Sequence, residues 1–189
     1  MITVGVSGVF NDPLIYAHPV IFPFIQLLLG EDAILGSFVA VTSLPGSKDQ
    51  ELHLDTSPLY GGSDIGADIP SCCLTLVLPL VDMNWQNGST AFYPGSRRAI
   101  TADAPDGSPV APEVGVGSAL LFDARVWHGG TANRSGAPRP VLYHSHHRPW
   151  FRDSVNFGQQ VPLDITAEEL ARGPDTHRHL FDWATEPSL

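Results

Sequence analysis

The sequence predicts a mainly β protein, an antiparallel sandwich, jelly roll or barrel with a few peripheral α-helices. Short runs of β-branched and apolar residues recur along the chain, each bounded by Gly, Pro, Asn or Asp. The 189 residues include 18 glycines and 17 prolines, which is typical of short strands joined by turns. Helix signals are few and short, which places the helices at the periphery.

Five runs have the composition of strands. They are residues 35–44, 72–81, 90–93, 118–123 and 141–147. Pro- and Gly-rich stretches at 57–70 and 103–117 separate some of these runs. Because strand patterns resume directly after each stretch, we expect long loops within one domain rather than linkers between domains.

Three segments have helix signals. The apolar run 22–29 ends at Gly30, a residue type that commonly ends helices. Thr166 and Glu169 form a capping-box pattern, and Gly173 is expected to stop the short helix that follows. Residues 175–184 are a further candidate.

Length and composition predict one domain, residues 1–189, that folds without disulfides or a structural metal. The net charge of −10 argues against nucleic acid and against anionic membrane as partners. The longest apolar run, residues 20–29, is too short for a membrane span, which needs about 20 residues. Only two cysteines are present, and they are adjacent. We therefore expect a soluble, cytoplasmic protein.

Histidines and one carboxylate have spacing that suits a metal. His53 and Asp55 stand at i and i+2, so on a strand they would project from one face while Leu54 packs on the other. His128 follows the apolar run 119–122, which places it at a strand end, and precedes two glycines that permit close approach. Two His and one carboxylate form the facial triad of non-haem Fe(II) oxygenases. The His-x-Asp pattern alone is weak, and a hydrogen-bonded His beside a loop-capping Asp is the alternative.

Arginines are concentrated in the middle of the chain. Seven of the ten cationic residues lie within residues 97–152, and all seven are arginine, whose planar fork suits a carboxylate. Arg139 lies eleven residues after His128, across the turn-like segment 131–138. We expect the two residues on neighbouring strands that face the same cavity, where Arg139 could hold a carboxylate.

The run of residues 144–147, which contains three histidines, could be a second metal cluster. Adjacent His146 and His147 must point to opposite faces of a strand, however, and the run contains no carboxylate or cysteine. We therefore favour a structural role for these histidines.

Four ordered elements together resemble the phytanoyl-CoA dioxygenase family of Fe(II)- and 2-oxoglutarate-dependent oxygenases. They are His53-Leu54-Asp55, residues 87–96 with Pro94-Gly95-Ser96, residues 122–130 with Trp127-His128-Gly129-Gly130, and Arg139. The likeness extends from about residue 30 to about residue 150. It implies a double-stranded β-helix, the jelly-roll fold of cupins, with iron held by His53, Asp55 and His128.

The resemblance also implies co-substrate contacts. Arg139 matches the residue that binds the distal carboxylate of 2-oxoglutarate, and Gln50 and Thr131 are further candidates for contact with it. The family usually has His after Pro-Gly-Ser, where this chain has Arg97. Its members are typically longer at the N-terminus.

The activity implied by the resemblance is oxidation of an unactivated C–H bond in a small natural-product-like or acyl substrate by O2. Decarboxylation of 2-oxoglutarate to succinate would accompany it. We expect the loops 57–70 and 103–117 to cover the substrate, and exposed turn-rich connections that do not contact a ligand are the alternative for both loops. Asp55 would fill the position that is left to chloride in related iron halogenases. Two alternatives are a cupin-like metalloenzyme that acts without 2-oxoglutarate and a non-catalytic β-sandwich binding module. The oligomeric state and the substrate stay open.

Overall fold

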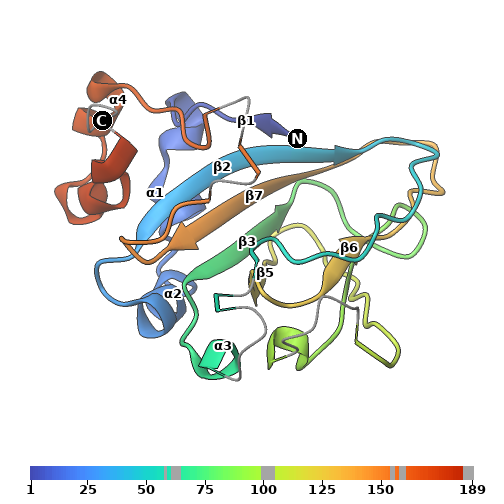
Figure 1. Cartoon of the computed structure of the whole chain (residues 1–189). Helices are drawn as coiled ribbons and strands as arrows, with labels where there is room; N and C mark the ends of the chain where they lie inside the picture. The colour runs from blue at the N-terminus through green and yellow to red at the C-terminus, as the bar shows by residue number, and fades with distance from the viewer. Residues whose placement is uncertain (58, 61–64, 99–104, 154–155, 158–160, 185–189) are drawn as a thin grey trace. The chain divides into compact units, whose positions relative to one another are not determined.

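The computed structural model describes residues 1–57, 59–60, 65–98, 105–153, 156–157 and 161–184 (Figure 1). The strands are β1 (Ile2–Thr3), β2 (Ile34–Ser43), β3 (Cys73–Pro79), β4 (Thr90–Phe92), β5 (Leu120–Asp123), β6 (His128–Gly130) and β7 (Arg139–His147). The α-helices are α1 (Pro13–Tyr16), α2 (Phe22–Leu29), α3 (Ile65–Asp68) and α4 (Ala167–Arg172). The 3-10 helices are η1 (Gly8–Asn11), η2 (Ser96–Arg98) and η3 (Asp175–Ala184). The mainly β class is confirmed.

The strands form two sheets. Five strands pair in the order β1-β2-β7-β3-β5, and β4 pairs with β6. The chain divides into two compact units, the first made of Met1–Ala40, Ser71–Leu76 and Tyr143–Leu189, and the second of Val41–Pro70 and Val77–Leu142. That residues 1–189 form one domain stays a prediction.

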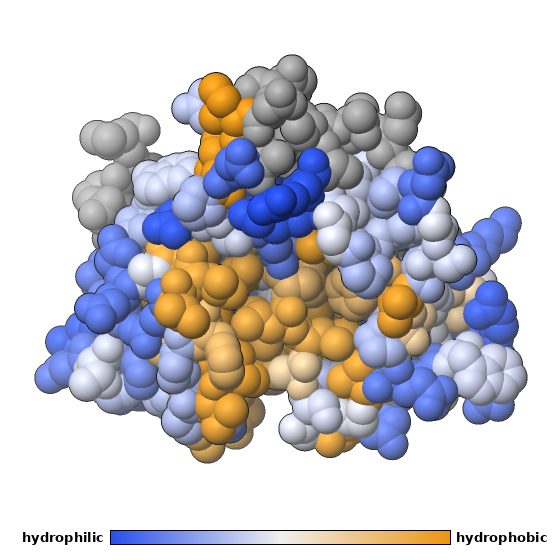
Figure 2. All heavy atoms as spheres, turned by 90° about the horizontal axis from the view of Figure 1, so that it is seen from below, coloured by the Kyte–Doolittle hydropathy of each residue, from blue (hydrophilic) through white to orange (hydrophobic). Residues whose placement is uncertain are grey.

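Helix α2 shows how the first unit builds its core. Phe22, Ile25 and Leu29, at helical spacing, are buried. The helix ends at Gly30, whose φ of 105° suits glycine and whose N–H donates to the carbonyl of Gln26. The opposite side of α2 exposes apolar side chains, and Figure 2 shows apolar residues at the surface of the structure.

Long-range hydrogen bonds attach the helices of the first unit to its strands. The indole Nε1 of Trp183, in η3, donates to the carbonyl of Leu35 at 2.8 Å. At the end of α1, the carbonyl of Tyr16 lies 3.0 Å from Nε2 of His146 in β7. These contacts attach η3 to β2 and the end of α1 to β7.

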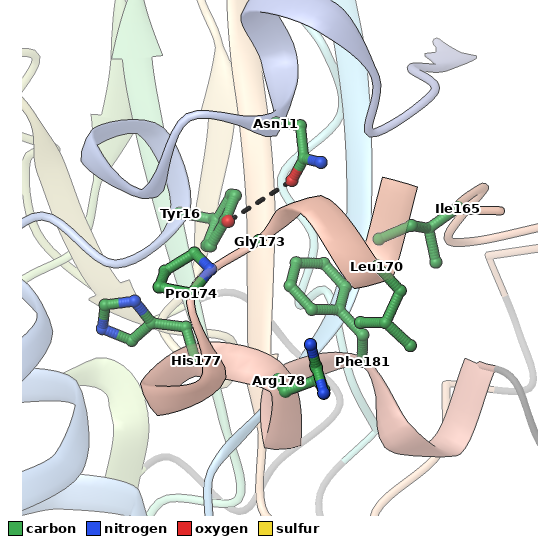
Figure 3. A pocket seen from close by; sticks show the side chains of 9 residues that line it. All are labelled: Asn11, Tyr16, Ile165, Leu170, Gly173, Pro174, His177, Arg178 and Phe181. Carbon is green, nitrogen blue, oxygen red and sulfur yellow. Dashed lines mark hydrogen bonds between the residues drawn. The ribbon is translucent and has the colours of Figure 1, made fainter. Parts of the chain in front are cut away.

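A shallow surface hollow lies in the first unit between α1, α4 and η3 (Figure 3). The Tyr16 hydroxyl donates to Oδ1 of Asn11 at 3.4 Å, and burial together with the charge of Asp12 raises the Tyr16 pKa to about 12. None of the predicted site residues lines this hollow, whose residues are Asn11, Tyr16, Ile165, Leu170, Gly173, Pro174, His177, Arg178 and Phe181.

Most predicted elements match the structure within two residues. Helix α2 has the predicted bounds, and the hydroxyl of Thr166 caps α4 by accepting from the N–H of Glu169. Residues 175–184 form the 3-10 helix η3. The predicted loop 57–70 contains the short helix α3, while residues 58, 61–64, 103 and 104 of the two predicted loops lie outside the described residues. Among the described residues, no helix has the length and hydropathy to cross a membrane.

The histidines of β7 are part of the core of the first unit. His144 and His146 are fully buried and His147 is almost so, and the ring of His144 lies edge-on to Phe38, with ring centroids 4.4 Å apart. Neither ring nitrogen of His144 has a hydrogen-bond partner among the described residues. In the described part of the chain, the cluster of His, Cys, Asp and Glu that could hold a metal does not include them. Their surroundings support the structural role.

We expect these buried histidines to make the protein sensitive to acid. Burial lowers the pKa of His144 to about 3, of His146 to about 4 and of His147 to about 3. Unfolded histidine titrates near pH 6.5, so between about pH 6.5 and these lower values the unfolded chain binds more protons. The free energy of unfolding should therefore fall as the pH falls through this window.

Urea unfolding across pH 4–7 measures this effect. His144→Phe keeps a ring beside Phe38 and should reduce proton uptake on unfolding at pH 5 by about one proton. His18→Gln, which removes a histidine that is not buried, is the control. Equal pH dependence in His144→Phe and the parent would contradict the neutral buried state of His144.

The close approach of β7 to β2 also depends on Gly36. A Cβ atom at this position would overlap the imidazole of His147. We expect Gly36→Ala to lower the free energy of unfolding by about 1–3 kcal/mol, because the buried ring must shift. At Gly136 an added Cβ meets no atom within 4 Å, so Gly136→Ala is the matched control. Urea unfolding of both variants checks this difference.

Candidate metal centre

The candidate centre lies in the second unit, where the segment that contains His53 meets β6. His53 and His128 form an isolated antiparallel bridge, with N–H···O distances of 2.9 and 3.0 Å. On its other edge β6 pairs with β4, with Phe92 opposite His128. Backbone pairing therefore places the two imidazoles on adjacent chain segments.

Two details differ from the predicted local structure. The His53 segment is not a regular strand, because it makes a single bridge and Asp55 lies in a bend. His128 does not end the preceding strand: β5 ends at Asp123, a turn follows, and His128 is the first residue of β6. The N–H of Asp55 donates to the carbonyl of Ala124 in that turn, at 2.9 Å. This bond, rather than strand alternation, holds the backbone of Asp55.

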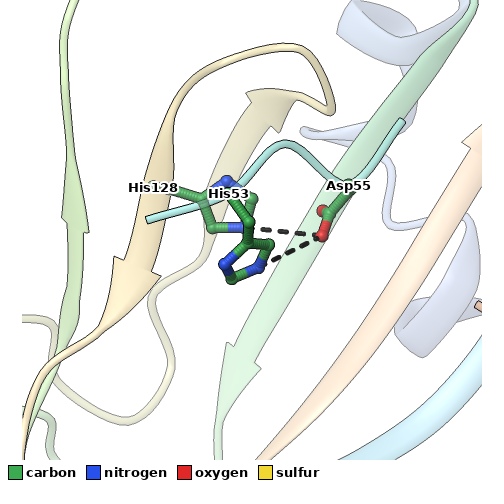
Figure 4. A group of neighbouring side chains, drawn as sticks. All are labelled: His53, Asp55 and His128. Carbon is green, nitrogen blue, oxygen red and sulfur yellow. Dashed lines mark ion pairs between the residues drawn. The ribbon is translucent and has the colours of Figure 1, made fainter. Parts of the chain in front are cut away.

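The three predicted ligands converge (Figure 4). The distance from Oδ1 of Asp55 is 3.8 Å to Nε2 of His53 and 3.5 Å to Nε2 of His128. All three ligand atoms lie within 4.8 Å of one another. Neighbouring ligands of an ion bound at about 2 Å and right angles would lie about 3 Å apart, so a small contraction is enough to bind one.

Backbone carbonyls fix the tautomer of both imidazoles. Nδ1 of His53 lies 2.8 Å from the carbonyl of Glu51, and Nδ1 of His128 lies 2.9 Å from the carbonyl of Val126. A carbonyl oxygen can only accept, so in each neutral ring the proton is on Nδ1 and the lone pair is on Nε2. Metal-binding histidines are commonly oriented in this way. The pattern, with the carbonyl two residues before each histidine, is not visible in the sequence.

The carboxylate and the burial of His128 act on its pKa in opposite directions. Burial is the largest single effect and lowers this pKa, but the hydrogen bond and charge of Asp55, together with the Val126 carbonyl, outweigh it and raise the pKa above its usual value. The site thus favours a positive charge between Asp55 and Nε2 of His128. A metal cation would take the place of that proton, so the donor set fits Fe(II).

Aromatic rings surround His128 on the protein side, a feature that sequence reasoning missed. The ring centroid of Phe122 lies 4.8 Å from that of His128, and that of Phe92 lies 6.1 Å away with the rings nearly parallel. His128 is buried, whereas 41% of the His53 side chain and 24% of that of Asp55 are exposed. The candidate centre is therefore packed on one side and open to a ligand on the other.

The predicted co-substrate residues lie in the same unit. Arg139 is the first residue of β7 and is buried. Gln50 uses Oε1 to accept from the N–H of Gly130 at 2.7 Å, and the Thr131 hydroxyl accepts from the N–H of Ser89 at 2.8 Å. Both side chains thus support the backbone around β6, and contact of all three residues with 2-oxoglutarate stays a prediction.

Solved structures with the same fold include non-haem oxygenases. A non-heme monooxygenase, the ThoJ–Ni complex, superposes with a TM-score of 0.61 at 18% identity, covering 95% of this chain and 70% of the other. The non-heme alpha ketoglutarate dependent epimerase SnoN from nogalamycin biosynthesis gives 0.59 at 20% identity, covering 79% and 62%. At this identity the likeness shows the fold, and it confirms the predicted jelly-roll class.

Sequence comparisons identify relatives. Dioxygenase af480 of Aspergillus fumigatus is 28% identical over 155 residues, 78% of this chain and 48% of that protein. The Fe(II)/2-oxoglutarate-dependent dioxygenase nvfF of Aspergillus novofumigatus is 28% identical over 147 residues, 73% and 49% of the two chains. The chain thus spans about half the length of these curated relatives. The family model described as Phytanoyl-CoA dioxygenase (PhyH) matches residues 11–141, more than half of the chain. The chain therefore belongs to the phytanoyl-CoA dioxygenase family.

Proposed function

We propose that the protein is a non-haem Fe(II)- and 2-oxoglutarate-dependent dioxygenase that oxidises an unactivated C–H bond of a small organic substrate. The observation that carries this proposal is the convergence of two Nε2 atoms and one carboxylate oxygen within 4.8 Å, with both tautomers set for metal binding. The family and the names of the relatives support the same chemistry.

The predicted metal ligands and Arg139 have different roles in this proposal. His53, Asp55 and His128 bind the metal from one side and leave its other positions to small ligands. The buried guanidinium of Arg139 binds the distal carboxylate of 2-oxoglutarate, because a fork of N–H donors matches a carboxylate. Bound Fe(II) would supply the reaction of O2 with 2-oxoglutarate, which yields succinate and CO2 and oxidises the substrate.

Succinate formation tests the proposal. The full chain is loaded with Fe(II) without oxygen, and binding of 2-oxoglutarate is measured by calorimetry. Succinate is then measured by NMR after O2 is admitted, with and without small natural-product-like and acyl compounds. We expect succinate only when Fe(II), 2-oxoglutarate and O2 are all present. A protein that binds metal at the triad but neither binds nor consumes 2-oxoglutarate would instead be the cupin-like metalloenzyme.

We expect oxygenation rather than halogenation. The family resemblance implies that related iron halogenases have a small residue where the carboxylate ligand would be, which leaves a coordination position for chloride. In this chain Asp55 supplies an anionic ligand at that position, so chloride has no open position there. With an accepted substrate and excess chloride, mass spectrometry of the parent reaction should detect only products that have gained oxygen or lost hydrogen. A chlorinated product would show that Asp55 is not a metal ligand.

A further inference from the structure

Arg97 stands where the family usually has histidine, and it joins two separate segments of the second unit. Its Nε donates to Oδ2 of Asp123 at 2.9 Å, and one terminal nitrogen donates to the carbonyl of Ile69 at 2.8 Å. The planar guanidinium thus spans a carboxylate and a backbone carbonyl at once. An imidazole is shorter and has at most two donors, so the change from histidine matters for this bridge.

A second arginine binds the same two acceptors. Arg125 donates from Nε to Oδ1 of Asp123 at 3.0 Å and from a terminal nitrogen to Oδ2 at 2.9 Å, a bidentate pair. Its other terminal nitrogen donates to the carbonyl of Ile69 at 3.1 Å. Asp123 and Arg125 are both buried. We call Arg97, Asp123, Arg125 and the Ile69 carbonyl the arginine clamp.

The clamp is built on the turn that holds the predicted metal ligands. The carbonyl of Ala124, between Asp123 and Arg125, accepts from the N–H of Asp55 at 2.9 Å. Two residues further, the carbonyl of Val126 sets the tautomer of His128. A displacement of this turn would therefore move the backbone of one ligand and the ring of another.

The clamp also holds the far end of the segment that begins at Asp55. Its near end is attached to the turn through Ala124, and its far end through the carbonyl of Ile69, which accepts from both arginines. Arg97 is held in turn, because Ser96 before it accepts from the N–H of Trp127 at 2.9 Å. Both ends of the segment from Asp55 to Ile69 are thus attached to the same short turn.

We propose that Arg97 is a positioning residue, which acts through Asp123 and the Ile69 carbonyl to keep Asp55 in place for the metal. The proposal rests on the proposed function only in taking His53, Asp55 and His128 as the ligands. Groups that orient metal ligands typically contribute about 10–100-fold to metal affinity. Arg97 contributes at this level although it does not touch the metal.

Co(II) binding to the full chain under anaerobic conditions tests the proposal, with the visible absorption of bound Co(II) as the signal. We expect Arg97→Ala to weaken Co(II) binding about 10-fold or more. Arg97→Lys should recover only a minor part, because one ammonium replaces a planar group that reaches two acceptors. Arg98→Ala removes the same charge from the adjacent, exposed side chain and should bind Co(II) as the parent does. Parent-like affinity in Arg97→Ala, or full recovery in Arg97→Lys, would overturn the proposal.

Chymotrypsin cleavage gives a second readout that needs no metal. Tyr60, between Asp55 and Ile69, is 70% exposed, and Trp150 in the first unit is 61% exposed. Arg97→Ala should speed cleavage after Tyr60 several-fold but not after Trp150, whereas Arg98→Ala should change neither. An equal rise at both sites would indicate general loosening and would count against the clamp. If the parent bound no Co(II), the assignment of the metal ligands would fail. The cleavage pattern would still show whether Arg97 restrains the segment from Asp55 to Ile69.

Discussion

His53→Ala should lose Fe(II) binding and iron-dependent succinate formation almost completely while the protein stays folded. A site with two remaining ligands, one of them the single carboxylate Asp55, has lost an imidazole whose lone pair is fixed toward the metal by the Glu51 carbonyl. The His53 side chain is 41% exposed, so its removal leaves no buried cavity and should barely change the free energy of unfolding. Calorimetry with Fe(II) under anaerobic conditions and urea unfolding measure the two effects.

Replacing either of the other two ligands by alanine should cause the same loss of metal binding, but the two variants should differ in how much stability they lose. His128→Ala removes a buried ring that contacts Phe92 and Phe122, so about 1–3 kcal/mol of stability should be lost as well. Asp55→Ala removes the anion that raises the pKa of His128. His18→Ala, outside the centre, is the control. If His128→Ala kept Fe(II) affinity and succinate formation close to the parent, the assignment of the triad would be wrong.

The fold was predictable where short-range signals are strong. The apolar run of α2 and its terminating Gly30 determine both ends of that helix, and the strands near residues 35–44 and 72–81 follow from β-branched runs. Strand β7 begins two residues before its predicted start, because Arg139 and Pro140 do not have the composition of a strand. Pairing with neighbouring chain segments, which the sequence does not show, decides such ends.

The metal centre was predictable as a set of residues but not as a geometry. Spacing suggested that His53 and Asp55 share a strand face, whereas the structure aligns them through a bridge to His128 and a bond to Ala124. Contacts over such sequence separations depend on the tertiary fold, so spacing offered His128 only as a candidate third ligand, and the resemblance to the family strengthened its link to the other two. The carbonyls of Glu51 and Val126 carry no sequence signal, because every residue has one.

The arginine clamp illustrates the same limit. The excess of arginine in residues 97–152 was visible, but surface arginines commonly have no function, and nothing in the spacing connects Arg97 with Asp123 or Ile69. The histidines of β7 are the opposite case. Their lack of carboxylate and cysteine neighbours predicted a structural role, and their burial, with His144 edge-on to Phe38, supports it.

Arg139→Ala should raise the concentration of 2-oxoglutarate needed for half-maximal binding by about one to two orders of magnitude. A charge-assisted pair between a guanidinium and a carboxylate contributes about 1.5–3 kcal/mol, which corresponds to that change in affinity. Because Arg139 is only 5% exposed, water would screen this pair little. Arg139→Lys should recover little of the affinity, since an ammonium cannot form the two parallel bonds.

The control for this prediction is Arg134→Ala, which removes an exposed arginine five residues earlier. Titration of the Fe(II)-loaded protein with 2-oxoglutarate under anaerobic conditions separates binding from turnover, and a parallel Fe(II) titration should give the parent affinity in both variants. Loss of 2-oxoglutarate affinity with Fe(II) affinity retained assigns Arg139 to the co-substrate. An unchanged 2-oxoglutarate titration in Arg139→Ala would remove that role and favour a cupin-like enzyme, because such an enzyme needs the triad but has no use for a buried arginine at the start of β7.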